Sequence, residues 1–155
     1  MQYQAVIAAP FAHLGVMFDH SGIRRIDFLP VTTPLLANPH PHIHALTQAL
    51  DKYWQNAAYQ PLGDVPVSYQ ATPHQTRVWQ ALSAIPAGYT RYYGEIAVQI
   101  ASSPRAVGQA CGANPLPILI PCHRVVGKTS AGGFMHSRDG AVLAYKQWLL
   151  NHEHG

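Results

Sequence analysis

Ile118-Leu119-Ile120-Pro121-Cys122-His123-Arg124-Val125 is the stretch around which the second half of this chain is organised. Its three consecutive apolar residues, 118–120, predict a short buried strand, and the proline predicts a turn directly after it. A thiol and an imidazole at the exit of such a strand are the parts of an activated sulfur nucleophile. The residue that most needs an explanation is therefore Cys122.

Cys122 also fits a purely structural role, because cysteine is among the most frequently buried residue types. An ordinary thiol is mostly protonated near pH 7, so a nucleophile needs a base nearby. His123 is the nearest candidate, but neighbours on a strand point to opposite faces, so contact requires a turn at Pro121 or a bridging water. The other cysteine, Cys111, is interpreted as structural, and a disulfide between the two is not expected in a reducing compartment.

Residues 1–70 are expected to form a small α/β lobe. Apolar runs separated by a turn at residues 19–22 predict a meander of three strands, at residues 6–9, 15–18 and 23–29. Apolar residues at helical spacing over 43–54 then predict one helix that packs on the sheet. An extended connection over 66–72 leads to the second part of the chain.

Residues 71–155 are expected to be mostly helical. One helix should begin at Pro73, and three more should cover residues 93–100, 105–112 and 141–152. Ser102-Ser103-Pro104 breaks the middle pair, which gives two short helices joined by a tight turn, similar to a helix-turn-helix. This signal is weak alone, since such pairs are common in proteins that never touch DNA. The Gly-rich segment 130–140 predicts a loop beside the thiol.

Composition favours a soluble protein of the reducing cytosol, since the chain has two cysteines, no basic N-terminal start and no long apolar run. Residues 1–76 carry three basic and four acidic side chains, whereas residues 77–155 carry seven basic and three acidic ones. A positive surface beside a thiol suits a phosphate-bearing substrate and would help to hold the thiolate. An ordinary solvated face explains the same charges equally well.

A metal site is not expected, although His40, His42 and His44 alternate along the chain. No cysteine or histidine cluster has the spacing of a structural zinc site, and Pro39 and Pro41 suggest a loop there. The sequence therefore predicts no metal and no cofactor.

The string from Asn114 to Val126 resembles the signature of the O6-alkylguanine-DNA alkyltransferases, also called methylated-DNA-protein-cysteine methyltransferases. The likeness is close over residues 72–153 and looser over residues 1–70. Further strings similar to family motifs are Val78-Trp79-Gln80-Ala81-Leu82, Ile85-Pro86-Ala87-Gly88-Tyr89-Thr90, Tyr93-Gly94-Glu95-Ile96-Ala97, Arg105-Ala106-Val107-Gly108 and Lys146-Gln147-Trp148-Leu149-Leu150. The resemblance implies an α+β fold with a ribonuclease-H-like lobe over 1–70 and a DNA-binding alkyltransferase domain over 71–155, whose helix-turn-helix is winged-helix-like.

The resemblance also implies a reaction and its partners. The partner is double-stranded DNA carrying O6-alkylguanine, with O4-alkylthymine as a second candidate, contacted through the minor groove. The damaged base is turned out of the duplex, and its alkyl group passes irreversibly to the protein's own cysteine. Such a protein acts once, needs no cofactor, and is expected to be a cytoplasmic monomer without membrane contact.

Each site residue is carried over by its match to the family motifs. Cys122 would be the acceptor and His123 its water-assisted base, with Glu153 orienting the imidazole and Asn114 bracing the turn. Further matches assign base binding to Tyr93, the Cys122 carbonyl, the Val125 amide and the pocket residue Phe134, and DNA contacts to Arg105, Ala106, Gly108, Tyr92 and Arg124. Arg105 would fill the gap left by the extruded base, and the small residues after it would lie against the minor groove.

The chain departs from the family pattern in three places: the stretch 96–105 is shorter, Tyr92 stands where serine is commoner, and Phe134 replaces a tyrosine before a longer loop. Two other functions compete with alkyl transfer. A lesion-binding protein without transfer activity would use the same DNA surface, and a Cys-His hydrolase would use the same thiol in repeated turnover.

Overall fold

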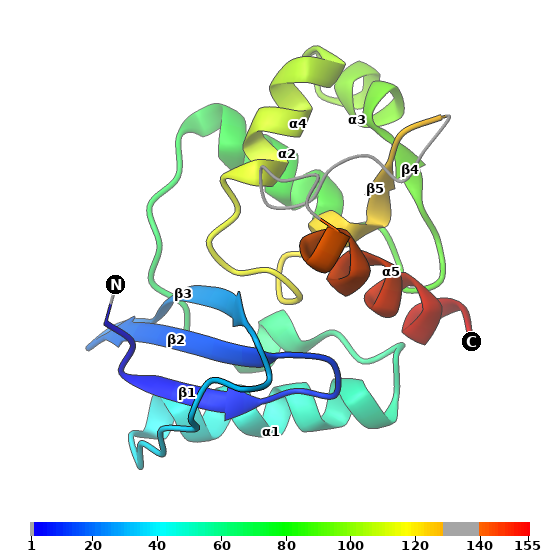
Figure 1. Ribbon diagram of the computed structural model, residues 1–155. Coiled ribbons are helices and arrows are strands. Elements are labelled where there is room, and N and C mark those ends of the chain that lie inside the picture. The colour runs from blue at the N-terminus through cyan, green and yellow to red at the C-terminus, as the bar shows by residue number, and fades with distance from the viewer. Residues whose placement is uncertain (1, 129–139) are drawn as a thin grey trace. The chain divides into compact units, whose positions relative to one another are not determined.

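The computed structural model describes residues 2–128 and 140–155, which form two compact units, Met1–Gln70 and Ala71–Gly155 (Figure 1). Helices and small sheets together make a mixed α+β protein, as the sequence predicts. Every helix among the described residues is too short or too polar to cross a lipid bilayer.

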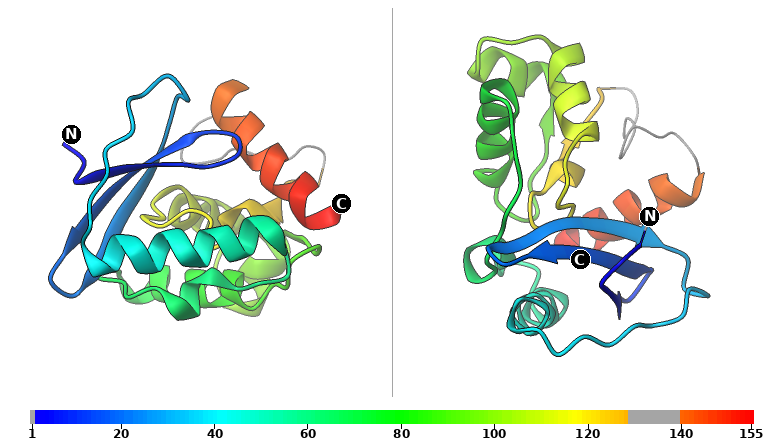
Figure 2. Two further views of the ribbon diagram at one scale, coloured as in Figure 1. Left: turned by 90° about the horizontal axis from the view of Figure 1, so that it is seen from below. Right: turned by 90° about the vertical axis from the view of Figure 1, so that its left-hand side faces the viewer.

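The first unit is a three-stranded antiparallel sheet in the order β1-β2-β3, with a helix along one face (Figure 2). Its elements are β1 Ala5–Ala8, β2 His13–Asp19, β3 Gly22–Leu29, α1 Pro41–Gln55 and a short 3₁₀ turn, η1 Pro61–Asp64. The predicted meander and helix are confirmed, with small shifts at their ends.

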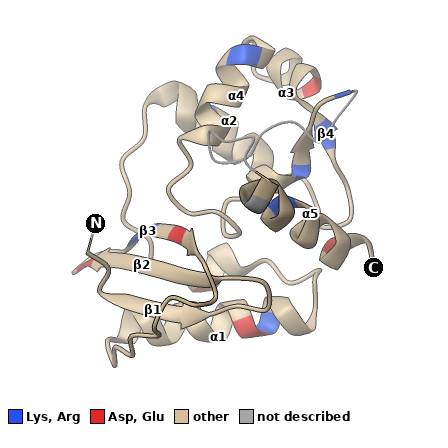
Figure 3. Ribbon diagram, in the orientation of Figure 1, with Lys and Arg blue, Asp and Glu red and all other residues tan. Residues whose placement is uncertain are grey.

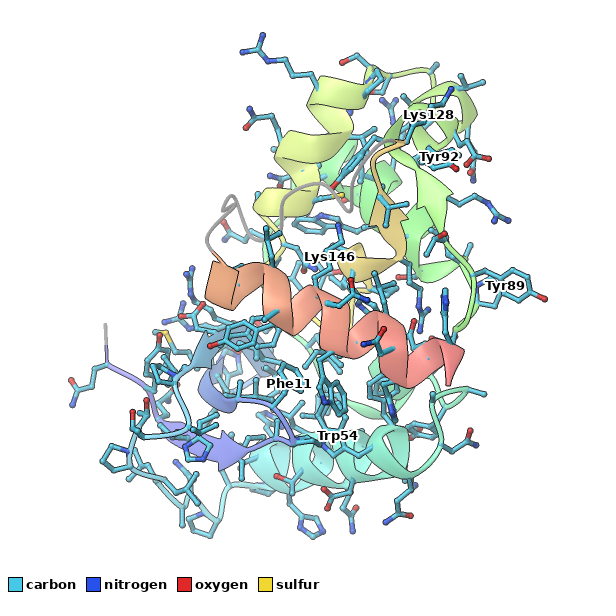
Figure 4. The ribbon with its side chains drawn as sticks, turned by 45° about the vertical axis from the view of Figure 1, so that its right-hand side comes forward. Phe11, Trp54, Tyr89, Tyr92, Lys128 and Lys146 are labelled. Carbon is cyan, nitrogen blue, oxygen red and sulfur yellow. The ribbon has the colours of Figure 1, made fainter. Side chains whose placement is uncertain are left out.

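Alternation along the strands builds the core of this unit, because every second side chain points to the same face. Val16 lies opposite Ile26 in the ladder, and both are fully buried, as is Leu14. The apolar residues of α1 recur at helical spacing and are buried: Ile43, Leu46, Ala49, Leu50 and Tyr53. Phe11 packs its ring edge-on to Trp54 of α1, 6.0 Å between centroids (Figure 4).

The alternating histidines prove to be the start of a helix rather than a loop. Pro41 occupies the first turn of α1, where its missing N–H costs nothing, and the His40 ring accepts a hydrogen bond from the His42 amide at 3.0 Å. Among the described residues, no group of three His, Cys, Asp or Glu side chains is arranged to hold a metal ion.

The second unit contains the helices α2 Pro73–Ser83, α3 Tyr93–Gln99, α4 Pro104–Gly112 and α5 Gly140–His154, and the two-residue strands β4 Arg91–Tyr92 and β5 Val125–Val126. The strands pair in parallel, Arg91 with Val125 and Tyr92 with Val126. The Trp79 indole donates to the Ala110 carbonyl at 2.9 Å, which ties α2 to α4 in the core.

Caps at the helix starts explain where the elements begin. Thr72 and Gln75 form a reciprocal capping box on α2, and the Ser103 hydroxyl accepts from the Ala106 amide at the start of α4. Between α3 and α4 the chain turns at Ala101, whose φ is 55°, while the Ser102 amide bonds back to the Ala97 carbonyl at 2.8 Å. The two short helices and tight turn predicted from the sequence are present.

The predicted strand at residues 118–120 is wrong. Ile118 has a φ of 76°, and the Ile120 amide bonds to the Leu116 carbonyl at 2.9 Å, so this segment is a buried turn. An apolar run signals burial but not the backbone conformation, which explains the error.

We predict that Gly22→Ala destabilises the first unit. A Cβ at Gly22 would lie 2.5 Å from the Pro66 carbonyl carbon and oxygen, where the Ile23 amide pairs with that oxygen. The expected loss in free energy of unfolding is about 1–3 kcal/mol, measured by urea denaturation. Gly63→Ala is the matched control, because a Cβ there meets nothing within 4 Å. Equal effects of the two substitutions would contradict this reading.

Candidate functional site

A tight turn presents the thiol and the imidazole. Pro121 has φ −84° and ψ 65°, and the Cys122 amide donates to the Ile120 carbonyl at 2.8 Å, which is the geometry of an inverse γ-turn. One turn of 3₁₀ helix, η2 Cys122–Arg124, follows directly. The predicted turn at Pro121 is therefore present, and it releases the following side chains from the strict alternation of a strand.

The Asn114 side chain braces this turn from three directions. Its amide nitrogen Nδ2 donates to the Ile120 carbonyl at 2.8 Å and to Cys122 Sγ at 3.2 Å, and its Oδ1 accepts from the Leu116 amide at 2.9 Å. Asn114 is itself buried, so all three bonds are shielded from water. The sulfur is thus fixed to the same side chain that shapes the preceding turn.

Burial raises the pKa of the Cys122 thiol to about 11, although the Asn114 hydrogen bond and the Lys146 charge both lower it. The thiol is only 3 % exposed. The expected positive surroundings therefore do not hold a thiolate in the resting protein, because desolvation outweighs them. With this pKa only about one thiol in ten thousand is ionised at pH 7, so the chemistry needs a base.

His123 is placed as a neutral base. Its Nε2 lies 2.8 Å from Glu153 Oε2, and both side chains are buried. Burial lowers the pKa of His123, against the raising effect of Glu153, so the ring is neutral near pH 7 and Nε2–H donates to the carboxylate. Nδ1 is then the free acceptor: it is a buried polar atom without a hydrogen-bond partner among the described residues.

Glu153 also holds Arg124. The Arg124 guanidinium donates through Nε to Oε1 at 2.9 Å and through Nη2 to Oε2 at 2.8 Å, and its Nη1 donates to the Ile85 carbonyl at 2.6 Å. A buried carboxylate that accepts from both an imidazole and a two-pronged guanidinium is fixed in orientation. Glu153 thereby joins α5 to the η2 turn.

Lys146 of α5 lies beside the chain that follows this turn (Figure 4). Lys146 is 1 % exposed, its Nζ donates to the Val125 carbonyl at 2.7 Å, and it lies 5.9 Å from the centre of the Tyr93 ring. The Val125 amide donates to the Cys122 carbonyl within the η2 turn. The prediction that this amide reads the base edge therefore conflicts with the structure, because its hydrogen is already used.

A family model matches residues 73–155, and its description is 6-O-methylguanine DNA methyltransferase, DNA binding domain. The chain belongs to this methyltransferase family. A constitutive methylated-DNA–protein-cysteine methyltransferase of Bacillus subtilis is 42% identical over 163 residues, which cover 99% of this chain and 96% of the relative. A methylated-DNA–protein-cysteine methyltransferase of Haemophilus influenzae is 32% identical, with 97% and 86% covered.

A solved structure of a methyltransferase agrees with the fold. The crystal structure of Mycobacterium tuberculosis OGT in complex with DNA is similar with a TM-score of 0.72 and 33% identity, and the match covers 96% of this chain and 90% of that one. The resemblance to the methyltransferase family that the sequence predicts is therefore confirmed over both compact units.

The residues that the sequence assigned to DNA contacts lie in three places: on α4, on β4 and in the η2 turn. Arg105 lies exposed in the first turn of α4, with Ala106 and Gly108 partly exposed after it, and Tyr92 is exposed on β4 with Lys128 Nζ 6.0 Å from its ring centre (Figures 3 and 4). Arg124 is only 1 % exposed and is bonded to Glu153, so its position does not fit a DNA contact. Phe134 lies outside the described residues.

Lys146 is the site residue that sequence reasoning missed. The signal was present, because Val142, Tyr145 and Leu149 recur at helical spacing, and residue 146 follows Val142 by four positions and so falls on the same face. A lysine on a buried helix face is rare enough to deserve a separate explanation.

We predict that Glu153→Gln destabilises the second unit by about 3–5 kcal/mol, because it leaves the buried Arg124 guanidinium without a countercharge. Urea denaturation measures the loss. Glu95→Gln is the matched control: Glu95 is exposed and, within residues 2–128 and 140–155, accepts a hydrogen bond from the Tyr92 amide alone, so its effect should be much smaller. A comparable loss in both variants would contradict the role given to Glu153.

Proposed function

We propose that this chain repairs DNA by transferring the alkyl group of O6-alkylguanine to Cys122 Sγ, once per molecule. The observation that carries the proposal is the buried Cys122–His123–Glu153 arrangement, in which a protonated thiol adjoins a neutral imidazole whose Nδ1 has no partner among the described residues. Family membership supports the donor and the reaction. O4-alkylthymine is a second candidate donor.

The transfer balances without a cofactor. The Cys122 proton passes to His123 Nδ1, across one water molecule, and the imidazolium that forms is stabilised by Glu153. The thiolate attacks the alkyl carbon, so a C–S bond forms while the bond from carbon to O6 breaks and its electron pair goes to guanine. The proton then moves from the imidazolium to the guanine anion. Nothing in this sequence removes the alkyl group from sulfur, which explains why each chain acts once.

Two backbone oxygens, one in η2 and one at the start of β5, and a tyrosine are proposed to read the extruded base. Guanine offers N–H donors on its base-pairing edge, and the carbonyls of Cys122 and Val125 are acceptors at the nucleophile itself. Tyr93 is proposed to polarise guanine from its N3 side, and Phe134 to form part of the pocket wall. Asn114 keeps the sulfur in line with these groups.

The DNA contact is proposed to involve the minor groove of the duplex. Arg105 would enter the space left by the extruded base, while the small residues Ala106 and Gly108 allow α4 to approach closely. Tyr92, with Lys128 over its ring, would contact the nucleotides beside the lesion. Unstacking costs a few kcal/mol, which these contacts must offset.

Finer features of the architecture belong to the same proposal. Residues 1–70 would form a ribonuclease-H-like lobe, and residues 71–155 a DNA-binding alkyltransferase domain whose α3 and α4 form a winged-helix-like helix-turn-helix. The protein would act as a monomer in the cytoplasm, where both buried cysteines stay reduced.

Intact-mass measurement tests the transfer directly. After incubation with a duplex containing O6-methylguanine, the chain should gain one methyl group, mapped to Cys122, with a stoichiometry that stops at one. Cys122→Ala should gain nothing yet keep lesion binding, and Cys111→Ala should behave like the unchanged protein. Tight binding without a mass change would instead indicate a lesion-binding protein, and repeated turnover would indicate a hydrolase.

Arg105→Ala should slow transfer from duplex DNA more than transfer from a single-stranded lesion. Only in the duplex does the extruded base leave a gap in the base stack, and Arg105 is proposed to fill that gap. Single-turnover rates on the two substrates measure this, and we expect a selective loss of about tenfold, the equivalent of one strong contact. Arg77→Ala, an exposed arginine of α2, is the control. If both substrates were equally unaffected by Arg105→Ala, the assigned role would be wrong.

A further inference from the structure

The turn between α3 and α4 is tied by hydrogen bonds to three helices. The Ser102 amide donates to the Ala97 carbonyl of α3 at 2.8 Å, and the Ser102 hydroxyl oxygen lies 2.8 Å from Nε2 of His74, in the first turn of α2. The next residue, Ser103, accepts from the Ala106 amide of α4 at 3.1 Å. Residues 102–103 are therefore the junction of α2, α3 and α4.

We infer that His74 is a positioning residue for alkyl transfer from duplex DNA: its bond to Ser102 fixes the direction of α4 and thereby the placement of Arg105. Arg105 follows the junction by two residues and lies in the first turn of α4, so a shift at the start of this helix displaces it directly. The inference deepens the proposed function and rests on it for the role of Arg105.

Helices α2 and α4 lie side by side and are joined at two separate points (Figures 1 and 2). Near the end of α4, the Trp79 indole donates to the Ala110 carbonyl at 2.9 Å. Before α4 begins, His74 bonds to Ser102. A helix attached at one point is free to tilt about it, whereas two attachments fix the direction of its axis. Loss of the His74 bond would let the end of α4 that carries Arg105 move most.

Packing between these two attachments is sparse. Ala106, Ala110 and Ala113 of α4 line an open groove beside the first turn of α2, together with His74. Side chains of a single carbon make few contacts across such a groove, so dispersion gives the helix pair little resistance to tilting there. The hydrogen bond of His74 is therefore needed to hold the start of α4.

The backbone of the turn does not favour its observed shape. Ala101 has a φ of 55°, in the left-handed region that a Cβ disfavours. Its amide bonds to the Val98 carbonyl at 3.3 Å while the Ser102 amide bonds to the Ala97 carbonyl, which is the Schellman pattern that usually has glycine at this position. Because alanine raises the energy of this turn, contacts from outside it must help to hold it, and His74 supplies one.

Transfer rates from duplex and single-stranded DNA that contain O6-methylguanine test this role. His74→Leu removes the hydrogen bond, and its single-turnover rate on the duplex should fall about fivefold, the effect of one lost hydrogen bond. The rate on the single strand should not change, because Arg105 is proposed to fill a gap that only the duplex has. His74→Gln is the matched control: glutamine has nearly the same helix propensity as leucine, and its amide both donates and accepts, so the duplex rate should be kept.

Ser102→Ala removes the other partner of the bond and leaves the backbone bonds of the turn in place. Its duplex rate should fall as much as that of His74→Leu. The variant that combines both substitutions should be no slower than either single one, because both remove the same interaction. Such non-additivity separates an action through Ser102 from a general loss of stability.

An unchanged duplex rate in His74→Leu, or an equal loss on both substrates, would overturn the inference, and so would a failure of His74→Gln to keep the rate. If the unchanged protein accepts no methyl group from either substrate, the proposed function is rejected instead. Amide hydrogen exchange then still tests the turn without DNA: the Ser102 and Ala106 amides should exchange about fivefold faster in His74→Leu than in His74→Gln. Equal exchange in the two variants would show that His74 does not hold the turn.

Discussion

The site depends on the hydrogen bonds of the Glu153 carboxylate. Two of its partners, His123 and Arg124, are buried polar side chains, and burying them without this acceptor would be unfavourable. Its two oxygens accept from the His123 imidazole and from two nitrogens of Arg124, all within 2.9 Å. Each bond fixes a different property: the guanidinium holds α5 against the η2 turn, and the imidazole bond selects the tautomer that leaves Nδ1 as an acceptor. Structure and reactivity are thus set by the same carboxylate.

Burial, and not a paired charge, sets the protonation state of the Cys122 sulfur. Burial makes Cys122 unreactive at rest, with a pKa of about 11, and the neighbouring Asn114 and Lys146 only reduce that penalty. A thiol kept protonated is protected from adventitious oxidants and alkylating agents, since the thiolate is the reactive form. In the proposed function, proton removal by the neutral His123 would tie reactivity to the moment at which the extruded guanine is bound, when the ionised sulfur has a substrate to attack.

The hydrophobic pattern of the sequence predicted most helices and strands correctly, but it did not predict contacts between residues far apart in the chain. Apolar runs on either side of a turn located the strands of the first unit, and helical spacing located α1, because these signals depend on burial alone. The apolar run 118–120 was read as a strand because burial does not reveal backbone conformation, which Ile118 and the Asn114 bonds set here. Arg124 was assigned to DNA through the family resemblance, and spacing along the chain could not reveal its partner Glu153, which lies 29 residues away. Glu153 itself was located through family resemblance, not through spacing.

The parallel pairing of β4 with β5 has a consequence for local opening. Strands of two residues have no stability of their own, so each persists only while α3 and α5 hold the flanking chain in place. Residues 91–92 and 125–126 should therefore lose their amide protection together, in the same cooperative event that exposes the core of the second unit. The segment next to Cys122 should therefore not open independently, and hydrogen exchange at its amides should report on the stability of the whole second unit.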